Sequence, residues 1–194
     1  KHGSSNVDKI VEYAFNERGI FALTLYAFSA ENWARPKKEV DALMRLLKNY
    51  IKKFASKLVS SQARLIVCGS REGLSSDLVK EIHEVEEKTK HHKKHILNIA
   101  LNYGGRQEIV SAVNKLIANN QNITVDGILD NLYTKESGEP DLIIRTGGEK
   151  RISNFLIFQS AYSELYFTDV LWPDFDGKEF DKAIEDFGER QRRF

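Results

Sequence analysis

One short segment of the chain concentrates side chains that could bind a phosphorylated ligand. Arg145 and Arg151 lie on either side of two glycines, and Ser153 follows them. A guanidinium group binds phosphate oxygens through paired N–H bonds, and free backbone N–H groups at the start of a helix favour the same negative charge. The apolar residues 155–158 are expected to belong to such a helix. The segment therefore predicts a diphosphate site, although a solvated basic turn has the same composition, and it matches neither the Walker loop nor the dinucleotide motif.

A second polar segment, residues 29–35, directly follows an apolar stretch of the chain. Glu31, Asn32, Trp33 and Arg35 supply a carboxylate, a carboxamide, an indole and a guanidinium within five residues. These groups suit a substrate site at the end of a strand. A capped loop in which Trp33 merely covers the core would use the same residues, so both interpretations stay open.

Glu164 stands among aromatic residues in the segment 162–167. A carboxylate in apolar surroundings needs a partner. Either a Mg²⁺ ion shared with a phosphate or a structural ion pair would supply one. The sequence leaves this choice open and favours the ion pair slightly.

Two further patterns carry less weight. Residues 102–106 repeat the order of strand, glycines, arginine and helix, which suits the same crevice, but a tight turn with a solvent-facing Arg106 is the simpler explanation. The histidines and lysines of residues 91–95 are typical of a solvated turn rather than of a metal site.

Alternating helix-like and strand-like segments must position these groups. Residues 21–28 are apolar on both faces, which is typical of a central strand of a parallel sheet, and residues 40–58 carry one apolar stripe at helical spacing. Further strands are expected at 64–68, 96–101 and 141–144, and further helices at 6–18, 75–90, 106–118 and after Thr124. This alternation predicts an α/β fold with a mostly parallel central sheet flanked by helices on both faces. Ligands of such sheets bind beyond the carboxyl ends of the strands.

Length and composition set the remaining limits. The 194 residues suit a single domain spanning residues 1–194, and the 41% hydrophobic and 29% charged residues exclude a mostly disordered chain. The net charge of +1 gives no global field for nucleic acid or an anionic membrane, so any anion site must be local. Cys68 is the only cysteine, which excludes an internal disulfide and fits a reducing cytoplasm. No apolar run approaches the about 18 residues that cross a bilayer.

Together these motifs resemble the cis-prenyltransferase (isoprenyl transferase) family, and within it the bacterial undecaprenyl diphosphate synthases. The matching segments follow the family's order along almost the whole chain: 26–36, 101–105, 141–155, 162–167 and 172–175. The resemblance implies a homodimeric, Mg²⁺-dependent enzyme that condenses isopentenyl diphosphate units onto farnesyl diphosphate with cis double bonds. The implied product is undecaprenyl diphosphate, the lipid carrier for bacterial cell-wall synthesis. It would be made in the cytoplasm and delivered to the membrane.

The resemblance also assigns roles to individual residues. It implies that Arg145, Arg151, Ile152 and Ser153 hold the diphosphate of isopentenyl diphosphate and that Glu164 binds the Mg²⁺ ion. It places Ser29, Ala30, Glu31, Trp33 and Arg35 along the substrate site. Asn32 matches the position that assists removal of a proton from the condensing unit.

Two of these implied roles can be refined with physical arguments. Because a carboxamide is a poor base, we expect Asn32 to orient the substrate or to relay the proton to the released diphosphate. A growing polyprenyl chain needs an apolar tunnel, which the resemblance places between sheet and helices. The stripe at residues 40–58, facing residues 21–28, is its expected wall, while ordinary core packing predicts the same stripe.

One family feature does not occur in the chain. The family opens with a strand and a loop containing Asp-Gly-Asn-Gly-Arg-Trp, whose aspartate binds Mg²⁺, and we expect this segment to precede Lys1 in the native protein. Two alternatives remain beside the transferase. One is a catalytically silent relative that acts as a binding or regulatory subunit. The other is a nucleotide-binding α/β protein that uses the Gly-Gly loops, although no base or ribose motif accompanies them.

Overall fold

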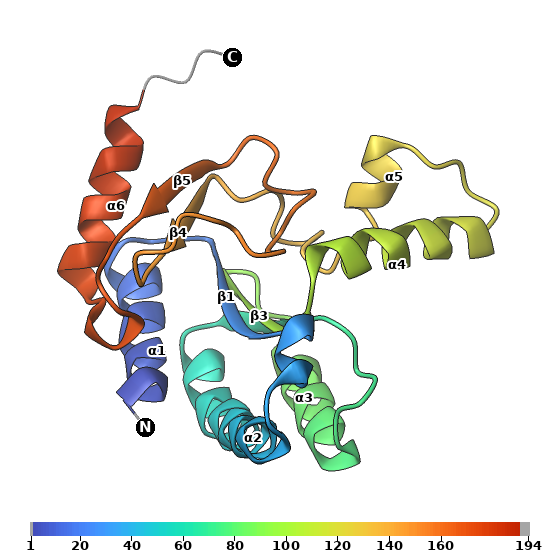
Figure 1. The fold of residues 1–194 in the computed structure, drawn as a ribbon, viewed down its shortest axis with the longest axis horizontal. Coiled ribbons are helices and arrows are strands. Elements are labelled where there is room, and N and C mark those ends of the chain that lie inside the picture. Colours follow the sequence, from blue (N-terminus) through green and yellow to red (C-terminus); the bar gives the residue numbers. More distant parts are fainter. Residues whose placement is uncertain (1, 191–194) are drawn as a thin grey trace. The chain divides into compact units, whose positions relative to one another are not determined.

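The computed structural model describes residues 2–190, with side chains from residue 6 onward, and the chain divides into two compact units (Figure 1). The central unit spans Phe21–Gly138, and the terminal unit combines Lys1–Ile20 with the segment after residue 138. Parallel strands and helices build both units, so the predicted α/β class is confirmed. The strands form two separate sheets, one in each unit.

The sheet of the central unit has three parallel strands in the order β1 (Ala22–Ser29), β3 (His95–Tyr103) and β2 (Ala63–Cys68). All but one of the residues of β3 are buried, whereas most of β1 is half-buried. The prediction that residues 21–28 form a central strand is therefore wrong for this sheet, where β1 is an edge strand. An apolar run that is half covered on both faces has the same composition as a fully buried strand. Composition alone therefore does not distinguish an edge strand from a central strand.

Helices α2 (Lys37–Ser60) and α3 (Ser76–Thr89) pack against each other and against β2. Figure 1 shows them on one side of the three-stranded sheet, with α4 (Gly105–Ala118) and α5 (Val125–Leu129) on the other. The apolar stripe of α2 is buried at Val40 and at its carboxyl-terminal half and is half-buried at Met44 and Leu47. The hydroxyl of Ser75 accepts a hydrogen bond from Leu78 N (3.3 Å) and caps α3.

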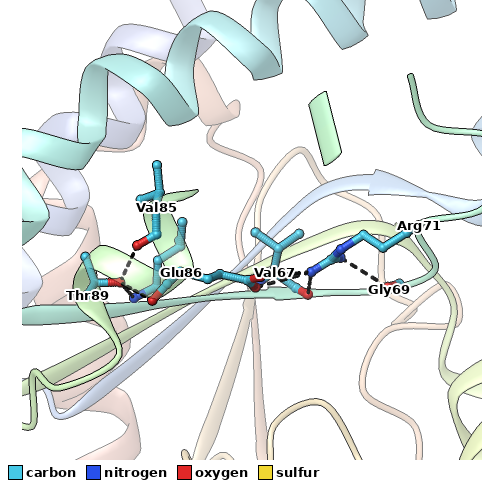
Figure 2. A network of polar contacts seen from close by, with 7 residues as sticks. Val67, Gly69, Arg71, Val85, Glu86 and Thr89 are labelled. Carbon is cyan, nitrogen blue, oxygen red and sulfur yellow. Dashed lines mark hydrogen bonds and ion pairs between the residues drawn. The ribbon is translucent and has the colours of Figure 1, made fainter. Parts of the chain in front are cut away.

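Side chains cover the outer edge of β2, as Figure 2 shows. Leu65 N donates to Thr89 Oγ1 (3.0 Å), and Val67 N donates to Glu86 Oε1 (2.8 Å). The Arg71 guanidinium donates to Val67 O (2.9 Å) and pairs with Glu86 (3.2 Å). These contacts satisfy backbone groups that an edge strand otherwise leaves open to pairing with another chain.

Cys68 ends β2 and is completely buried as a free thiol. Burial disfavours the thiolate and raises the pKa of Cys68 well above its usual range. The side chain therefore acts as a small core residue.

The terminal unit carries a second, two-stranded parallel sheet of β4 (Leu142–Arg145) and β5 (Glu164–Phe167). Its helices are α1 (His2–Glu12), which continues as a π-helical turn at Tyr13–Glu17, and α6 (Gly177–Glu189), with a short 3₁₀ turn at Trp172–Asp174. Asp181 of α6 accepts hydrogen bonds from Tyr13 Oη and Arg18 Nε (both 2.6 Å). The bond from Arg18 holds the pKa of Asp181 below its usual value.

None of the helices in the described part of the chain combines the length and apolarity needed to cross a membrane.

Candidate functional site

The segment after β4 gathers three of the predicted phosphate-binding groups. Arg145 Nη1 donates to Ser153 Oγ (2.7 Å) and also to the backbone carbonyl of Arg151. Arg151 pairs with Glu149 of the same loop, and both side chains of that pair are more than half exposed. An exposed ion pair of this kind adds little stability, so Arg151 can exchange Glu149 for an incoming anion at small cost.

Glycines shape the first turn of this loop. Gly147 and Gly148 have φ values of +87° and +80°, a region that favours glycine. Their N–H groups donate to Val170 O and Thr168 O (both 2.9 Å). These two bonds attach the loop to the segment that follows β5. The two N–H groups are therefore not available to bind a ligand.

The helix expected to include residues 155–158 does not form, and residues 153–162 run through turns instead. Ser153, Asn154 and Leu156 have φ values of +49°, +63° and +46°, and successive left-handed residues cannot continue a right-handed helix. The predicted anion site at a helix start is therefore wrong. Binding by this loop rests on its side chains.

Glu164 has the ion pair that the sequence left as one of two alternatives. Its carboxylate contacts Arg190 Nη1 at 2.6 Å, and Arg190 also binds Asp186 (2.5 Å) and the carbonyl of Leu165 (3.1 Å). The hydrogen bond to Glu164, followed by that to Asp186, raises the pKa of Arg190. Arg190 thereby joins the end of α6 to the start of β5.

The register of β4 and β5 separates Glu164 from the arginine loop. Glu164 is opposite Leu142, and Arg145 is opposite Phe167, so the two groups stand at opposite ends of the strand pair, about 10 Å apart along it. Arg145 contacts the side chain of Ser153 and the backbone of Arg151, whereas Glu164 stands at the other end of the strand pair. Across residues 2–190, no group of three or more His, Cys, Asp or Glu side chains could hold a metal ion.

The second predicted loop, residues 29–35, follows β1 as a short 3₁₀ turn at Ala30–Ala34. Asn32 Oδ1 accepts a hydrogen bond from Ser29 N (3.1 Å), which closes the turn on itself. Glu31, Trp33 and Arg35 are exposed, while Ser29, Ala30 and Asn32 are half-buried. The side-chain oxygen of Asn32 is therefore already engaged in shaping the loop.

Asn102 connects several elements at this edge; the sequence grouped it with residues 102–106 but assigned it no role of its own. Its Oδ1 accepts from Trp33 Nε1 (2.7 Å), and its Nδ2 donates to the carbonyls of Ser70 (3.0 Å) and Glu72 (2.9 Å). One amide thus joins the end of β3 to the loops that follow β1 and β2. The sequence feature that could have indicated this role is an asparagine directly before Tyr-Gly-Gly. The φ of Asn102 is +50°, a backbone conformation that asparagine tolerates.

The Trp33 ring has neighbours besides the hydrogen bond at its nitrogen. Its ring meets Phe28 edge to face at a centroid distance of 5.4 Å, and Gly73 lies against the other part of the indole. Trp33 therefore covers the core, as the simpler interpretation held, and also has a fixed orientation at the carboxyl edge of the sheet.

Tyr26 lies beneath this loop. Burial, followed by the nearby charge of Glu31, raises the pKa of Tyr26 to about 12, so the phenol stays protonated near neutral pH. Its hydroxyl donates to the carbonyl of Tyr103 (3.3 Å). This hydrogen bond adds a further contact between the ends of β1 and β3 under the loop.

These geometries place polar and cationic side chains beyond the carboxyl ends of parallel strands in both units, which is where α/β proteins hold phosphorylated ligands. Comparison with known proteins agrees with that class. The family model described as "Putative undecaprenyl diphosphate synthase" matches residues 1–194. An isoprenyl transferase of Fusobacterium nucleatum is 51% identical over 193 residues, covering 99% of this chain and 83% of the relative, and that of Aquifex pyrophilus is 47% identical with the same coverage.

Two solved structures extend the comparison. A crystal structure titled as a probable undecaprenyl diphosphate synthase from Campylobacter jejuni has a TM-score of 0.90 and 35% identity, covering 100% of this chain and 91% of the other. Lavandulyl diphosphate synthase from Lavandula x intermedia, in complex with dimethylallyl diphosphate, has a TM-score of 0.92 and 32% identity, covering 99% and 86%. The chain belongs to the cis-prenyltransferase (isoprenyl transferase) family.

Proposed function

We propose that this protein condenses isopentenyl diphosphate units onto farnesyl diphosphate with cis double bonds and releases undecaprenyl diphosphate. The observation that carries the proposal is the Arg145, Arg151 and Ser153 loop in a chain 51% identical to an isoprenyl transferase. The structural relative that was solved with dimethylallyl diphosphate supports an allylic diphosphate as one substrate.

The arginine loop would act on the charge of the diphosphates. Cations that are already in position bind the negative charge of a diphosphate without reorganising. Arg145 is oriented by Ser153 and by the carbonyl of Arg151, so its guanidinium is set before a ligand arrives. Ile152 lies between these partners along the chain, and in our proposal this segment holds isopentenyl diphosphate.

The loop at residues 29–35 would position the other reactant. Asn32 already accepts from Ser29 N, so in our proposal it orients the substrate through its amide rather than acting as a base. Trp33, fixed by Asn102 and Phe28, would offer a rigid aromatic surface beside the allylic chain. Glu31, Arg35, Ser29 and Ala30 complete the proposed lining.

We propose Mg²⁺ as the cofactor, with Glu164 as one ligand. A single carboxylate fits this ion, because Mg²⁺ usually binds through one or two carboxylates together with substrate phosphates and water. When bound, it would neutralise charge on the departing diphosphate. Glu164 would first have to exchange its contact with Arg190.

The product requires an apolar path, and the half-buried Met44 and Leu47 of α2 are our candidates for its lining. We further propose a homodimer that works in the cytoplasm, peripheral to the inner face of the membrane, where the lipid product is used.

The test is incubation of the full-length protein with farnesyl diphosphate, labelled isopentenyl diphosphate and Mg²⁺, followed by mass analysis of the products. We expect a long polyprenyl diphosphate with cis double bonds. In Arg145→Ala, loss of a charge-assisted contact of about 1.5–3 kcal/mol should raise the KM for isopentenyl diphosphate by about 10- to 100-fold. Lys150→Ala removes an exposed cation from the same loop and should leave that KM unchanged.

Two results would contradict the proposal. A product of only one condensation, as in a short-chain synthase, would refute the long-chain assignment. Diphosphate binding without any condensation, measured by calorimetry on the same sample, would identify a catalytically silent relative instead.

A further inference from the structure

Positive charge is distributed unevenly along the central unit. Residues 42–71 and 88–107 contain no aspartate or glutamate, although the chain has 28 of these residues against 29 lysines and arginines. These two acid-free stretches carry the following cations: Arg45, Lys48, Lys52, Lys53, Lys57, Arg64, Arg71, Lys88, Lys90, Lys93, Lys94 and Arg106. The net charge of +1 therefore conceals a strong local excess of positive charge in these two stretches.

The parallel register brings parts of both stretches to one edge of the three-stranded sheet. Ala63 of β2 is opposite His95 of β3, so α2, which ends just before β2, and the connector from α3 to β3 arrive at the same edge. His92 Nδ1 lies 3.2 Å from Ala63 O and joins the two segments directly. This is the amino edge, opposite the edge that carries the loops around Asn102.

Four cations of the two stretches pair with acidic neighbours, in contrast to four exposed lysines at the amino edge. Lys48 pairs with Asp77 (3.1 Å), Arg64 with Glu136 (3.6 Å), Arg71 with Glu86 (3.2 Å) and Lys90 with Glu87 (2.5 Å). Within residues 2–190, by contrast, the structure gives no ion pair to Lys52, Lys53, Lys93 or Lys94, and all four are exposed. Lys57 lies beside them with its ammonium over the Phe54 ring at 6.0 Å.

Two large apolar side chains are exposed at the same edge. Phe21 precedes β1 and is 51% exposed, and its carbonyl accepts a hydrogen bond from Ile96 N (2.8 Å) at the start of β3. Val59, in the last turn of α2, is 46% exposed. Lysines around exposed apolar side chains are the combination that lies on an anionic bilayer, with the ammonium groups at the headgroups and the apolar groups at the acyl boundary.

We infer that this basic edge, formed by Lys52, Lys53, Lys57, Lys93 and Lys94 with Phe21 and Val59, docks the protein on an anionic lipid surface. Charge complementarity and the exposed apolar groups favour a bilayer over a nucleic-acid duplex, whose stacked bases offer no acyl boundary to Phe21 and Val59. The choice of a lipid surface also rests on the proposed polyprenyl product, which must reach a membrane. Docking at the amino edge leaves the loops at the carboxyl edge of this sheet accessible to soluble substrates.

The test is flotation of the whole protein with vesicles at low salt, without any diphosphate substrate. We expect binding to vesicles of equal parts phosphatidylcholine and phosphatidylglycerol, weak binding to pure phosphatidylcholine, and release by high salt. Each lysine beside an anionic surface contributes a factor of about five, so Lys52→Gln with Lys53→Gln should weaken the partition by roughly 25-fold. Lys93→Gln with Lys94→Gln should weaken it to a similar extent.

Lys37→Gln with Lys38→Gln is the matched control. These two lysines are adjacent and exposed, like Lys52 and Lys53, but they begin α2 about 22 Å away along the same helix. That distance exceeds the screening length of about 10 Å, so the control pair should change the partition by less than about twofold. Circular dichroism of all variants checks that the fold is kept.

Equal losses in the control and the amino-edge pairs would overturn the inference, as would unchanged binding in both amino-edge pairs. Tighter binding to duplex DNA than to anionic vesicles would assign the surface to nucleic acid instead. Because the assay contains no substrate, vesicle binding without condensation would refute only the proposed function, and condensation without vesicle binding would refute only the docking surface.

Discussion

The loops around Asn102 and the loop after β4 both follow the ends of parallel strands, yet they are built in opposite ways. Asn102 binds Trp33 and two backbone carbonyls through one side chain, and Gly69 packs so tightly against β3 that no side chain fits there. The loop after β4 is fastened by two glycine N–H groups, and within residues 2–190 its two arginines bond to a hydroxyl, a carbonyl and an exposed carboxylate.

The difference indicates a division of tasks. A flat aromatic surface must be fixed to be useful, because a mobile indole loses entropy on binding. Cations that receive a diphosphate need weak partners that a stronger anion can replace. We therefore expect substitutions around Asn102 to change stability and orientation, and substitutions in the arginine loop to change binding.

Gly69→Ala should have the largest effect. Its φ is +128°, and an added Cβ would lie 2.0 Å from the carbonyl oxygen of Leu101, a backbone atom that cannot move without breaking the sheet. We expect a loss of about 3–5 kcal/mol in the free energy of unfolding, measured with urea. Gly138→Ala is the control, since it has a φ of +75° and no atom within 4 Å, and it should cost about 1 kcal/mol. Equal losses would show that the close approach at Gly69 is unimportant.

Asn102→Gly should have the second largest effect on stability. Glycine keeps the left-handed backbone and removes three hydrogen bonds, for an expected loss of about 2 kcal/mol. The emission of Trp33 should shift to the red, measured in a Trp172→Phe background because the chain has only two tryptophans.

Asn102→Asp separates the two functions of this amide. It keeps the acceptor for Trp33 Nε1 and loses both donors to the loop after β2, so stability should fall while the Trp33 emission stays. An unshifted emission in Asn102→Gly would mean that Phe28 alone orients the indole.

Arg190→Gln tests whether Glu164 can exchange its ion pair with Arg190 for a ligand. It frees Glu164 from its 2.6 Å ion pair, so the affinity for Mg²⁺ in the presence of inorganic diphosphate should rise a few-fold by calorimetry. The free energy of unfolding should fall by less than about 1 kcal/mol, because the pair is partly exposed. An unchanged Mg²⁺ affinity would argue against Glu164 as a ligand.

Tyr26→Phe should have the smallest effect on stability, and this effect should be measurable only at alkaline pH. The pKa of Tyr26 is raised to about 12 in the folded protein and is about 10 when unfolded, so below pH 10 neither state is ionised. As the pH rises from 10 toward 12, the unfolded state ionises first and stability falls, by roughly 1 kcal/mol after solvent screening. The variant should lose less stability than the wild type over that range in urea titrations. Parallel losses would show that Tyr26 is not the titrating group.

The sequence predicts those parts of the fold that local patterns determine. The strands expected at 64–68, 96–101 and 141–144 lie within one or two residues of β2, β3 and β4, and the helices expected at 75–90 and after Thr124 correspond to α3 and α5. The failures have non-local causes. Ser153 and Asn154 adopt left-handed conformations although neither is a glycine. Nothing in the local sequence indicated these conformations, so a helix was expected there.

The candidate site shows the same limit. Types and spacing of Arg145, Arg151 and Ser153 sufficed to group them, because all three lie within nine residues. Asn102 was missed because its partners come from loops about 30 and 69 residues away in the chain. Arg190 was not foreseen as the partner of Glu164, since nothing local connects them across 26 residues.

The buried thiol at the end of β2 has a practical consequence. Because Cys68 is inaccessible, reluctant to ionise and the only cysteine in the sequence, maleimide dyes should leave the native chain unlabelled. A cysteine introduced at a chosen surface position would then carry the only probe. Fluorophores attached in this way could follow loop closure or approach to a liposome in real time, without first removing a native sulfhydryl.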